Sequence, residues 1–468
     1  MYCSPGSSHV GPARRSRNGP ILSAPNAWPV PGFNSRYPTS RKEHRRSVVA
    51  DARGDSLIGA HRHNPTYAQC TGSGDQPLRV LHLVSTFAVK TDTKWLYQLL
   101  KRLPRDRLAS SIACMYGGGE MRAAFEQAGF ATFDLQAARS LDPLGLWRLL
   151  RLIRRVRPHI VHTHLLRADL YGGLAARLAG VPIVLTTQYA LYPYSRVTQR
   201  ACDNLLDRMC RSLASHALAV CEAVRQDLIV RLGWPAERVH TIRTGLDFSA
   251  WRPDPQARQT LREQWAVPKD GIVIMTVARL SREKGLDVLV DAAARVRTQC
   301  PQARFVLVGS GPLEQSLARQ IRDRGLEETV RLAGFHTDVA SVLSAADVFV
   351  LPSYSEGMPN AVLEAFAAGL PVVASAVGGL VEAVDHERTG LLVPAGDAAA
   401  LAEAVSRLIQ DPSLARTLAQ AGVAVARERF SIDKVAAEYA ALYASLGASR
   451  PGMPPASVTV DGRGVTVS

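Results

Sequence analysis

The sequence lacks the features that mark membrane-spanning and exported chains. Among its 468 residues there is no unbroken apolar run of about 18 residues, which a transmembrane helix requires. No apolar core follows the arginines near the amino terminus, so this region does not have the pattern of a secretory signal. We therefore expect a cytoplasmic protein without a transmembrane helix.

Cysteine is scarce and scattered. The seven cysteines form no CxxC pair and no even framework, which is typical of free thiols in a reducing compartment. This spacing also gives no reason to expect a structural metal. The cysteines are Cys3, Cys70, Cys114, Cys202, Cys210, Cys221 and Cys300.

Positive charge is concentrated in the first half of the chain. The formal net charge is +6 over residues 1–77, +11 over residues 78–250 and −2 over residues 251–468, which sums to the total of +15. A basic first half indicates that this half faces an anionic partner. No recognised nucleic-acid motif accompanies the charge, so we expect no nucleic-acid partner.

Apolar patterning divides the chain into segments. Residues 1–77 are rich in Gly, Pro, Ser, Arg and His and show no periodicity, so we expect a disordered basic segment. After it, strand-like apolar runs alternate with helical stretches, stop at a poorly patterned region and then restart. The expected parts are a first domain at 78–250, a linker at 251–270, a second domain at 271–430, a helix at 431–447 that crosses back to the first domain, and a flexible tail at 448–468.

This alternation predicts an α/β protein with two doubly wound, Rossmann-like domains in tandem, each a parallel sheet with helices on both faces. Ligands of such sheets bind beyond the carboxyl ends of the strands, so the active site is expected in the cleft between the domains. The predicted strands are 79–84, 111–115, 159–162, 183–187 and 217–221 in the first domain, and 271–277, 304–308, 330–333, 348–351, 372–375 and 391–393 in the second.

Residues 355–365 carry the clearest functional signal, with Glu356 in a loop and Glu364 about a turn and a half into the following helix. Pro359 suits the first helical position, which leaves the amide groups of residues 360–362 free to bind phosphate at the helix start. Each carboxylate can accept from both hydroxyls of a vicinal diol. A nucleotide-sugar offers two such diols with a diphosphate between them. The alternative is an ordinary strand–turn–helix with two solvated glutamates.

The segment continues as Ala365-Phe366-Ala367-Ala368-Gly369-Leu370-Pro371-Val372-Val373-Ala374-Ser375. With this continuation it resembles the retaining glycosyltransferases of the GT4 family, whose fold is called GT-B, and the resemblance covers about residues 78–447. It implies transfer of a sugar from a nucleotide-diphosphate donor to a hydroxyl acceptor with retention, without a metal or other cofactor. The context favours a UDP-sugar over GDP-mannose. Because the departing phosphate helps to activate the acceptor in that family, we name no protein base.

The resemblance also assigns catalytic residues. Arg279 and Lys284 would stabilise the negative charge of the leaving diphosphate, a task that suits cationic side chains and the planar guanidinium fork. Arg282 lies between them and has no such role. His164 matches the family's histidine at a strand end near the donor sugar and the leaving phosphate. The expected catalytic residues are therefore His164, Glu356, Arg279 and Lys284.

Further residues are expected to bind or line the donor site, with the loop of Phe335 and His336 beside the nucleobase. The full set is Glu364, Gly357, Met358, Pro359, Asn360, Ala361, Gly309, Gly311, Gly334, Phe335, His336, Gly378 and Gly379.

His162 and His164 would point to one face of a strand, where they could act as ligands of a zinc ion. Two histidines without a third ligand nearby make a poor zinc site. A hydrogen-bonded structural role remains the alternative for His164.

Three positions depart from the family pattern. The Gly-Gly loop after the first strand is replaced by residues 85–93, a frequent histidine is Gln188, and the Asn-Gly-x-Asp turn reads Thr244-Gly245-Leu246-Asp247. All three belong to the acceptor or hinge side, so they bear on the acceptor's identity more than on activity. A nucleotide-sugar epimerase of similar fold and a non-catalytic glycosyltransferase-like subunit remain alternatives.

A predicted helix at 144–156 carries Trp147 among leucines and is strongly basic elsewhere. This pattern is typical of a helix at an anionic membrane surface, and a solvated charged face over the domain core is the alternative. Docking at the inner membrane face would fit a lipid-linked or cell-envelope glycan acceptor. The candidate docking residues are Trp147, Arg148, Arg151, Arg154, Arg155 and Arg157.

Overall fold

The computed structural model describes residues 76–88, 91–137, 142–191, 203–448, 458–461 and 464–467. All of these belong to one compact unit that begins at Tyr67. The expected disordered segment 1–77 lies almost entirely outside the described residues.

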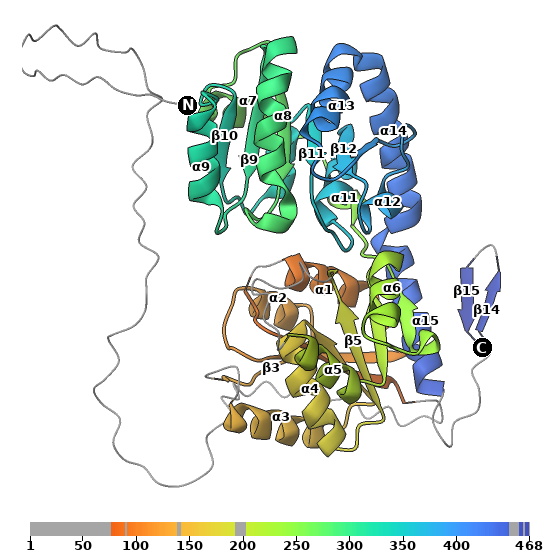
Figure 1. Ribbon diagram of the computed structural model, residues 1–468. Helices are drawn as coiled ribbons and strands as arrows, with labels where there is room; N and C mark the ends of the chain where they lie inside the picture. Colours follow the sequence, from red (N-terminus) through yellow and green to blue (C-terminus); the bar gives the residue numbers. More distant parts are fainter. Residues whose placement is uncertain are drawn as a thin grey trace, which may run out of the picture. The chain divides into compact units, whose positions relative to one another are not determined.

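The first domain, coloured from orange to yellow-green in Figure 1, is built on a parallel sheet. The strand order of this sheet is β3-β2-β1-β4-β5-β6-β7. Its strands are β1 (Leu78–Val84), β2 (Leu108–Cys114), β3 (Ala131–Asp134), β4 (Ile160–His164), β5 (Ile183–Gln188), β6 (His216–Ala219) and β7 (Val239–Thr241). The helices between them are α1 (Thr91–Arg102), α2 (Met121–Gln127), α3 (Pro143–Val156), α4 (Leu166–Leu178), α5 (Asp203–Leu213) and α6 (Glu222–Val230).

The second domain repeats this plan with the strand order β10-β9-β8-β11-β12-β13. Its strands are β8 (Ile272–Val277), β9 (Ala303–Val308), β10 (Val330–Gly334), β11 (Val348–Leu351), β12 (Val372–Ser375) and β13 (Leu391–Val393). Its helices are α8 (Leu286–Gln299), α9 (Glu314–Asp323), α10 (Val339–Ser344), α11 (Asn360–Ala367), α12 (Leu380–Ala383), α13 (Ala398–Gln410) and α14 (Pro412–Phe430).

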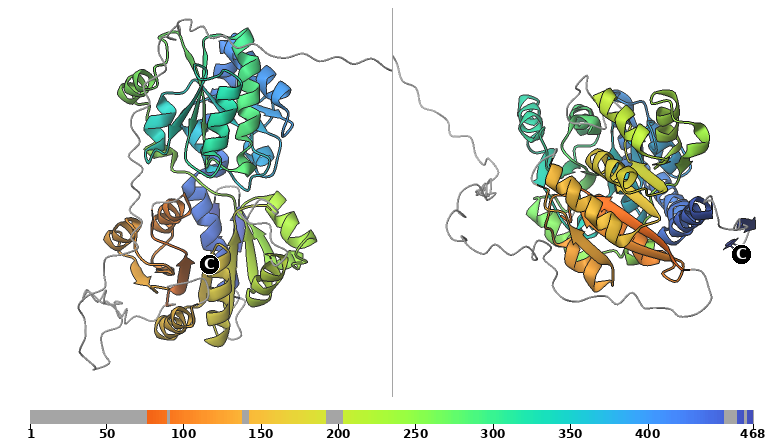
Figure 2. Two further views of the ribbon diagram at one scale, coloured as in Figure 1. Left: turned by 60° about the vertical axis from the view of Figure 1, so that its left-hand side comes forward. Right: turned by 90° about the horizontal axis from the view of Figure 1, so that it is seen from below.

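Helices cover both faces of each sheet (Figure 2), and the strands are apolar on both faces for that reason. In β9, Phe305 and Leu307 pack into one core cluster, while Val306 and Val308 pack into the other. Successive side chains of a strand point to opposite faces, so a continuous apolar run fills two cores at once. The predicted GT-B architecture, two tandem doubly wound domains, is confirmed.

The segment expected as a linker contains a helix, α7 (Pro255–Gln264). Arg258 and Arg262 of this helix both pair with Asp347, which also accepts a hydrogen bond from the Val273 amide at the start of β8. The sequence looked poorly patterned because α7 is amphipathic through long arginine side chains and buries no residue fully. Part of 251–270 is therefore folded onto the second domain.

The chain returns to the first sheet through α15 (Ile432–Ala448). Tyr439, Tyr443 and Leu446 of this helix share a core cluster with Val80 of β1 and Trp95 of α1. The expected flexible tail contains a described two-stranded antiparallel sheet, β14 (Val458–Asp461) with β15 (Gly464–Val467). None of the helices in the described part of the chain is long and apolar enough to span a membrane.

Candidate active site

The predicted site residues follow the strands at which the order of each sheet reverses. In the first sheet β1 lies beside β4, and in the second β8 lies beside β11. His164 ends β4, Arg279 and Lys284 follow β8, and Glu356 follows β11. Open parallel sheets bind ligands at such switch points, because the loops on either side leave in opposite directions.

Glu356 is buried and held by two hydrogen bonds to the same oxygen. Lys284 Nζ lies 2.6 Å and Ser353 Oγ 2.7 Å from Glu356 Oε1. Only 7% of the Glu356 surface is exposed, and Ser353 is fully buried. Both partners engage one oxygen, so the carboxylate is oriented and Oε2 is the atom left to meet a ligand.

The two predicted phosphate-binding cations differ in their surroundings. Lys284 belongs to a short helical turn, η3 (Arg282–Lys284), and is bound to Glu356. Arg279 is exposed, and its guanidinium has no partner within the described part of the chain. Arg282 is exposed as well. The structure thus brings Lys284 to the loop between β11 and α11 that contains Glu356, which we call the glutamate loop. Arg279 lies exposed just after the end of β8, where it can reach a ligand.

The start of α11 differs by one residue from the prediction. Pro359 is the N-cap with an extended backbone, and Asn360 is the first helical residue. The amide of Val362 donates to the Pro359 carbonyl at 3.2 Å. This amide was predicted to be free for phosphate, and the prediction is wrong at this position. The helix begins later because the cap residue keeps non-helical dihedrals while its carbonyl accepts the first helical bond.

Two polar side chains of α11 are positioned for a ligand. The amide oxygen of Asn360 is shielded from solvent and lacks a hydrogen-bond partner among the described residues. Burial raises the pKa of the Glu364 carboxyl to about 7, and the charge of Lys94 from the first domain opposes that rise. The Lys94 ammonium also donates to the Thr337 carbonyl at 3.2 Å. A buried acceptor without a partner is costly, so both groups indicate a binding site.

The glycines of the glutamate loop permit close backbone contacts. A Cβ on Gly378, whose φ is +49°, would collide with the Glu356 carbonyl, and a Cβ on Gly379 would collide with the Gly357 carbonyl. A Cβ on Gly357 would in turn collide with the Tyr189 carbonyl of the first domain. Because these three glycines lack side chains, the backbone of the turn before α12 packs directly on the glutamate loop. The backbone of that loop in turn packs directly on the residue after β5. Met358 of this loop is buried, and Ala361 is half-buried.

The second glycine turn packs against the loop that carries Arg279. A Cβ on Gly309 would collide with the Ala278 carbonyl, and one on Gly311 with the Leu280 carbonyl. Gly334 is the last residue of β10, and its carbonyl accepts a hydrogen bond from the Gly309 amide at 2.8 Å.

The loop after Gly334 has a different surface. Phe335 is 65% exposed, and His336 lies edge-on to Trp265 with the ring centroids 6.2 Å apart. An exposed aromatic ring beside this strand end is available to stack on a ligand.

Three histidines stack under the switch point of the first sheet. His82 of β1 pairs in register with His162 of β4, and His164 follows two residues later on the same face. The centroids of His162 and His164 lie 4.3 Å apart, and those of His82 and His164 lie 5.6 Å apart. His82 was not predicted as part of this site, because only the pairing of β1 with β4 brings it next to the other two histidines.

This cluster supplies the third ligand that the zinc hypothesis lacked, with ring nitrogens within 4.8 Å of one another. Its geometry is nevertheless that of a hydrogen-bonded network. His164 contacts Tyr189 Oη at 2.8 Å and His82 at 3.3 Å, and His162 contacts Tyr443 Oη at 2.7 Å and Thr187 Oγ1 at 2.6 Å. A metal would have to displace hydroxyl partners of these rings.

Burial sets the charge of the cluster. It lowers the pKa of His164 to about 3, and the pKa values of His82 and His162 are also well below the usual value because of burial first and neighbouring histidines second. Neutral His164 can orient a ligand but cannot supply positive charge to a leaving phosphate. Among the predicted catalytic residues, positive charge is carried by Lys284 and Arg279.

Two of the three departures from the family pattern make side-chain contacts in the structure, whereas residues 89 and 90 of the third, 85–93, lie outside the described residues. Gln188 donates to Asp169 at 3.2 Å, and Asp169 also accepts from Thr163 and Thr186 at 2.6 Å each. Burial raises the pKa of Asp169 to about 6, and these hydrogen bonds oppose the rise. Asp247, in the atypical turn, pairs with Arg102 at 2.7 Å.

The predicted docking helix, α3, buries its apolar face in the domain core through Leu149 and Ile153. Its opposite face carries Leu144 and Trp147, each 52% exposed. Arg151 lies over the Trp147 ring at 5.4 Å, and Arg154 and Arg155 are exposed nearby on the helix.

Two of the predicted docking arginines do not belong to this outer face. Arg148 donates to the carbonyls of Leu135 and Gln136. Arg157 caps the helix in a left-handed conformation. Of the predicted docking residues, Trp147, Arg151, Arg154 and Arg155 remain candidates for this face, and the structure adds Leu144, which was not predicted.

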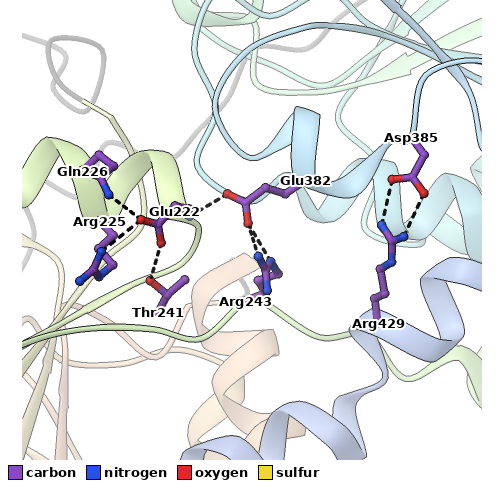
Figure 3. Close-up of polar contacts among 8 residues, drawn as sticks. All are labelled: Glu222, Arg225, Gln226, Thr241, Arg243, Glu382, Asp385 and Arg429. Atoms are coloured by element: carbon purple, nitrogen blue, oxygen red, sulfur yellow. Dashed lines mark hydrogen bonds and ion pairs between the residues drawn. The ribbon is translucent and has the colours of Figure 1, made fainter.

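Several residues that build the site carried little signal in the sequence. Ser353 lies three residues before Glu356, where a buried hydroxyl could have been expected to hold the carboxylate. Tyr189 follows Gln188 directly, so the strand end was in view but the contact with His164 was not. Glu382 and Arg243 meet only in the folded chain (Figure 3).

Comparisons with known proteins agree with this geometry. Residues 257–424 match the family described as Glycosyl transferases group 1, and residues 93–250 match Glycosyltransferase Family 4. The alpha-maltose-1-phosphate synthase of Mycolicibacterium smegmatis is 32% identical over 62% of this chain and 79% of its own length. The Escherichia coli UDP-Gal:alpha-D-GlcNAc-diphosphoundecaprenol alpha-1,3-galactosyltransferase is 29% identical over 58% and 72%, respectively.

A solved structure is similar as well. The Anabaena protein HepE in complex with UDP-glucose superimposes with a TM-score of 0.68 at 25% identity, covering 79% of this chain and all of that chain. Two doubly wound domains with a glutamate loop at the second switch point define a GT-B glycosyltransferase. The chain belongs to the GT4-type glycosyltransferases, enzymes that transfer a sugar to an acceptor.

Proposed function

We propose that the protein transfers a sugar from a UDP-sugar to a hydroxyl group, with retention of configuration at the sugar carbon. The donor lies against the start of α11, with Glu364 accepting from the ribose diol and Glu356 Oε2 accepting from the sugar hydroxyls. The diphosphate lies between Lys284, Arg279 and the amide groups that begin α11.

One observation carries the proposal. The shielded amide oxygen of Asn360 lacks a hydrogen-bond partner among the described residues. Asn360 begins α11, directly after the loop of Glu356, whose carboxylate is already oriented by Lys284 and Ser353. An orphaned buried acceptor is stabilised when a ligand donates to it. A polyhydroxylated donor satisfies this oxygen and both glutamates together.

The donor base and acceptor class are supported by named relatives. HepE was solved with UDP-glucose, and the E. coli relative uses UDP-Gal and a diphosphoundecaprenol-linked acceptor according to its name. Amylovoran biosynthesis is named for a further relative in Erwinia amylovora. We therefore propose an acceptor that is lipid-linked or part of a cell-envelope glycan.

Such an acceptor requires the enzyme to work at a membrane surface. We propose that the enzyme is cytoplasmic and docks peripherally on the inner face of the membrane, through the exposed face of α3. Leu144 and Trp147 would enter the interface while Arg151, Arg154 and Arg155 meet anionic head groups.

No metal is included in the proposed chemistry. Lys284 and Arg279 supply the positive charge that offsets the leaving diphosphate, and the departing phosphate takes part in acceptor activation. EDTA is therefore expected to leave turnover unchanged. Strong inhibition that added metal reverses would contradict this assignment of the charge.

The decisive experiment is a donor screen. Binding and turnover of UDP-, GDP-, ADP- and dTDP-sugars are measured with wild-type protein and with Glu364→Ala, in the presence of membrane extracts as an acceptor source. UDP-sugars should bind and turn over only in the wild type. Binding without turnover for every donor would favour the non-catalytic subunit, whereas conversion of a donor without an acceptor would favour an epimerase.

A further inference from the structure

The carboxylate of Glu382, in the second domain, makes polar contacts with two groups of the first domain (Figure 3). Its Oε1 accepts a hydrogen bond from the backbone amide of Glu222 at 2.7 Å. Its Oε2 pairs with the guanidinium of Arg243, at 2.7 Å from Nε and 2.6 Å from Nη2. Only 15% of the Glu382 side chain is exposed. Both partners belong to the first domain, so relative motion of the domains must break both contacts.

The backbone amide that donates to Glu382 belongs to Glu222, the first residue of helix α6. The N-cap of α6 is Cys221, which makes no side-chain capping bond. The first amide groups of a helix are unsatisfied and carry partial positive charge, so a carboxylate there is stabilising. Glu382 thus supplies from the other domain the cap that the sequence of α6 does not provide.

The carboxylate of Glu222 itself is engaged elsewhere. It accepts from Gln226 at 2.6 Å, Arg225 at 3.2 Å and Thr241 at 3.4 Å, all within the first domain. These bonds hold the start of α6 against β7, so the partner that Glu382 meets is a fixed one. The contact therefore fixes the position of Glu382 relative to the first domain.

Within the second domain, Glu382 is connected to the glutamate loop through the preceding turn. It belongs to α12, which begins directly after Gly378 and Gly379. Those glycines pack on the carbonyls of Glu356 and Gly357, and the Gly379 amide lies 3.4 Å from the Glu356 carbonyl. Glu382 thus lies only four positions after Gly378, the residue that packs on the Glu356 carbonyl.

We infer that Glu382 is a positioning residue for sugar transfer, which holds the Gly378–Gly379 turn and the Glu356 loop in place against the first domain through Arg243 and the start of α6. It touches no substrate. The inference rests on the proposed donor site at Glu356. The nucleotide is bound mainly by the second domain, so loss of Glu382 should reduce turnover much more than nucleotide affinity.

The first test reads the contact itself. Hydrogen exchange of the amides in residues 221–226 is compared between wild type, Glu382→Ala and Arg243→Gln. The Glu222 amide should exchange about tenfold or more faster in Glu382→Ala, because its acceptor is removed. Arg243→Gln should accelerate it less, since the amide keeps its acceptor. Unchanged protection in Glu382→Ala would overturn the inference.

The second test separates positioning from folding, using UDP-glucose for turnover and UDP for binding. Glu382→Ala should lower kcat at least about tenfold while the Kd for UDP changes less than about twofold. Arg243→Gln lies at a half-exposed position, so it tests the same contact if Glu382→Ala fails to fold. Equal losses of kcat and UDP affinity would show a structural role only and would overturn the inference.

A matched control lies in the same segment. Asp385 makes a two-pronged pair with Arg429, both distances being 2.9 Å, and both residues belong to the second domain (Figure 3). Asp385→Asn should lower the melting temperature but leave Glu222 exchange and kcat unchanged. If it lowered kcat as much as Glu382→Ala does, the cross-domain contact would have no special role.

Failure of the proposed function gives a different result. If wild-type protein bound neither UDP nor UDP-glucose, the donor assignment would be wrong, yet the exchange of the Glu222 amide would still report the contact. In that case kcat is measured with the nucleotide-sugar that the wild type does turn over.

Discussion

In the proposed donor site, the carboxylate of Glu364 binds hydroxyl groups in its ionised form, which burial disfavours. Within α11 the side chain is half-buried, and burial raises the pKa of its carboxyl to about 7. Near neutral pH, therefore, the unliganded protein holds this carboxyl partly protonated. Hydroxyl donors from a bound ribose stabilise the ionised form.

The first prediction concerns this side chain. Glu364→Ala should abolish transfer while leaving the fold intact, because a transition-state contact is removed from the helix without disturbing its backbone. The expected loss is on the order of a hundredfold or more in kcat/KM, equivalent to about 3 kcal/mol. Steady-state kinetics with the preferred donor measure the loss, and circular dichroism checks the fold. Wild-type turnover would remove Glu364 from the donor site.

The second prediction concerns pH. Burial raises the pKa of Glu364 from its usual 4.5 to about 7, so the native state binds more protons than the unfolded state between about pH 4.5 and 7. Stability therefore falls as pH rises through this window, by at most about 3 kcal/mol. Glu364→Gln removes the cost of ionisation and should be more stable than wild type at pH 8 but not at pH 5.

Urea unfolding at several pH values measures this difference. Arg282→Gln, an exposed change of charge elsewhere in the second domain, serves as a control and should show no such pH dependence relative to wild type. A constant difference between Glu364→Gln and wild type from pH 5 to 8 would mean that Glu364 is ionised throughout.

The third prediction compares the cations of the second switch point. Replacing Lys284 by Ala should lower kcat about a hundredfold or more, because the leaving group loses its charge partner and Glu356 loses a hydrogen bond. Arg279→Ala should also lower kcat heavily, whereas Arg282→Ala should have a mild effect. If all three variants behaved alike in the same assay, the diphosphate would have to lie elsewhere.

At the scale of elements, the active site is built from turns that approach each other at backbone distance. The glycine turn before α12 touches the loop before α11, and that loop touches the end of β5. Side chains have no room in these contacts, so the turns transmit displacement directly.

The fourth prediction follows from this packing. Gly378→Ala places a methyl group against the Glu356 carbonyl and should lower kcat at least about tenfold, because the loop must shift. Gly369→Ala is the matched control: its φ is also positive, +76°, but no atom lies within 4 Å of its Cβ position. It should cost about 1 kcal/mol of stability from strain alone and leave kcat unchanged. Thermal melting and kinetics on both variants decide the matter.

At the scale of the whole molecule, charge and exposed apolar groups coincide in one region of the first domain. Residues 78–250 have a net charge of +11, and the outer face of α3 carries Leu144, Trp147 and three exposed arginines. Each cation near an anionic surface contributes about 1 kcal/mol within a Debye length of roughly 10 Å. Reversible, salt-sensitive membrane binding is the expected result.

The fifth prediction tests this face. Arg151, Arg154 and Arg155 are changed together to Gln, which should reduce sedimentation with anionic vesicles at low salt by about tenfold or more. A variant with Arg295, Arg319 and Arg427 changed to Gln removes the same charge from the second domain and should bind as wild type does. A deletion of residues 1–77 is run alongside, because that segment carries +6. Equal loss in both triple variants would mean that only net charge matters.

The central strands and the Glu-x7-Glu helix were predictable because their signals are local. Buried parallel strands are continuous apolar runs, and β8, β11, β12 and β13 lie within a residue of their predicted bounds. The edge strands β3 and β7 were missed, since their side chains are largely half-buried and show no such run. Helix α7 was missed because its arginines, and not an apolar stripe, hold it to the domain.

The sequence by itself determined the family, the order of the two domains and the side chains of the glutamate loop. Each of these depends on residues that are close together in the chain. Tertiary structure alone decided which of these groups meet. Ser353 and Lys284 converge on Glu356 because β8 lies beside β11, and His82 joins His164 because β1 lies beside β4. Glu382 caps a helix of the other domain, 160 residues away. Such pairings depend on strand order and domain packing, which no local pattern encodes.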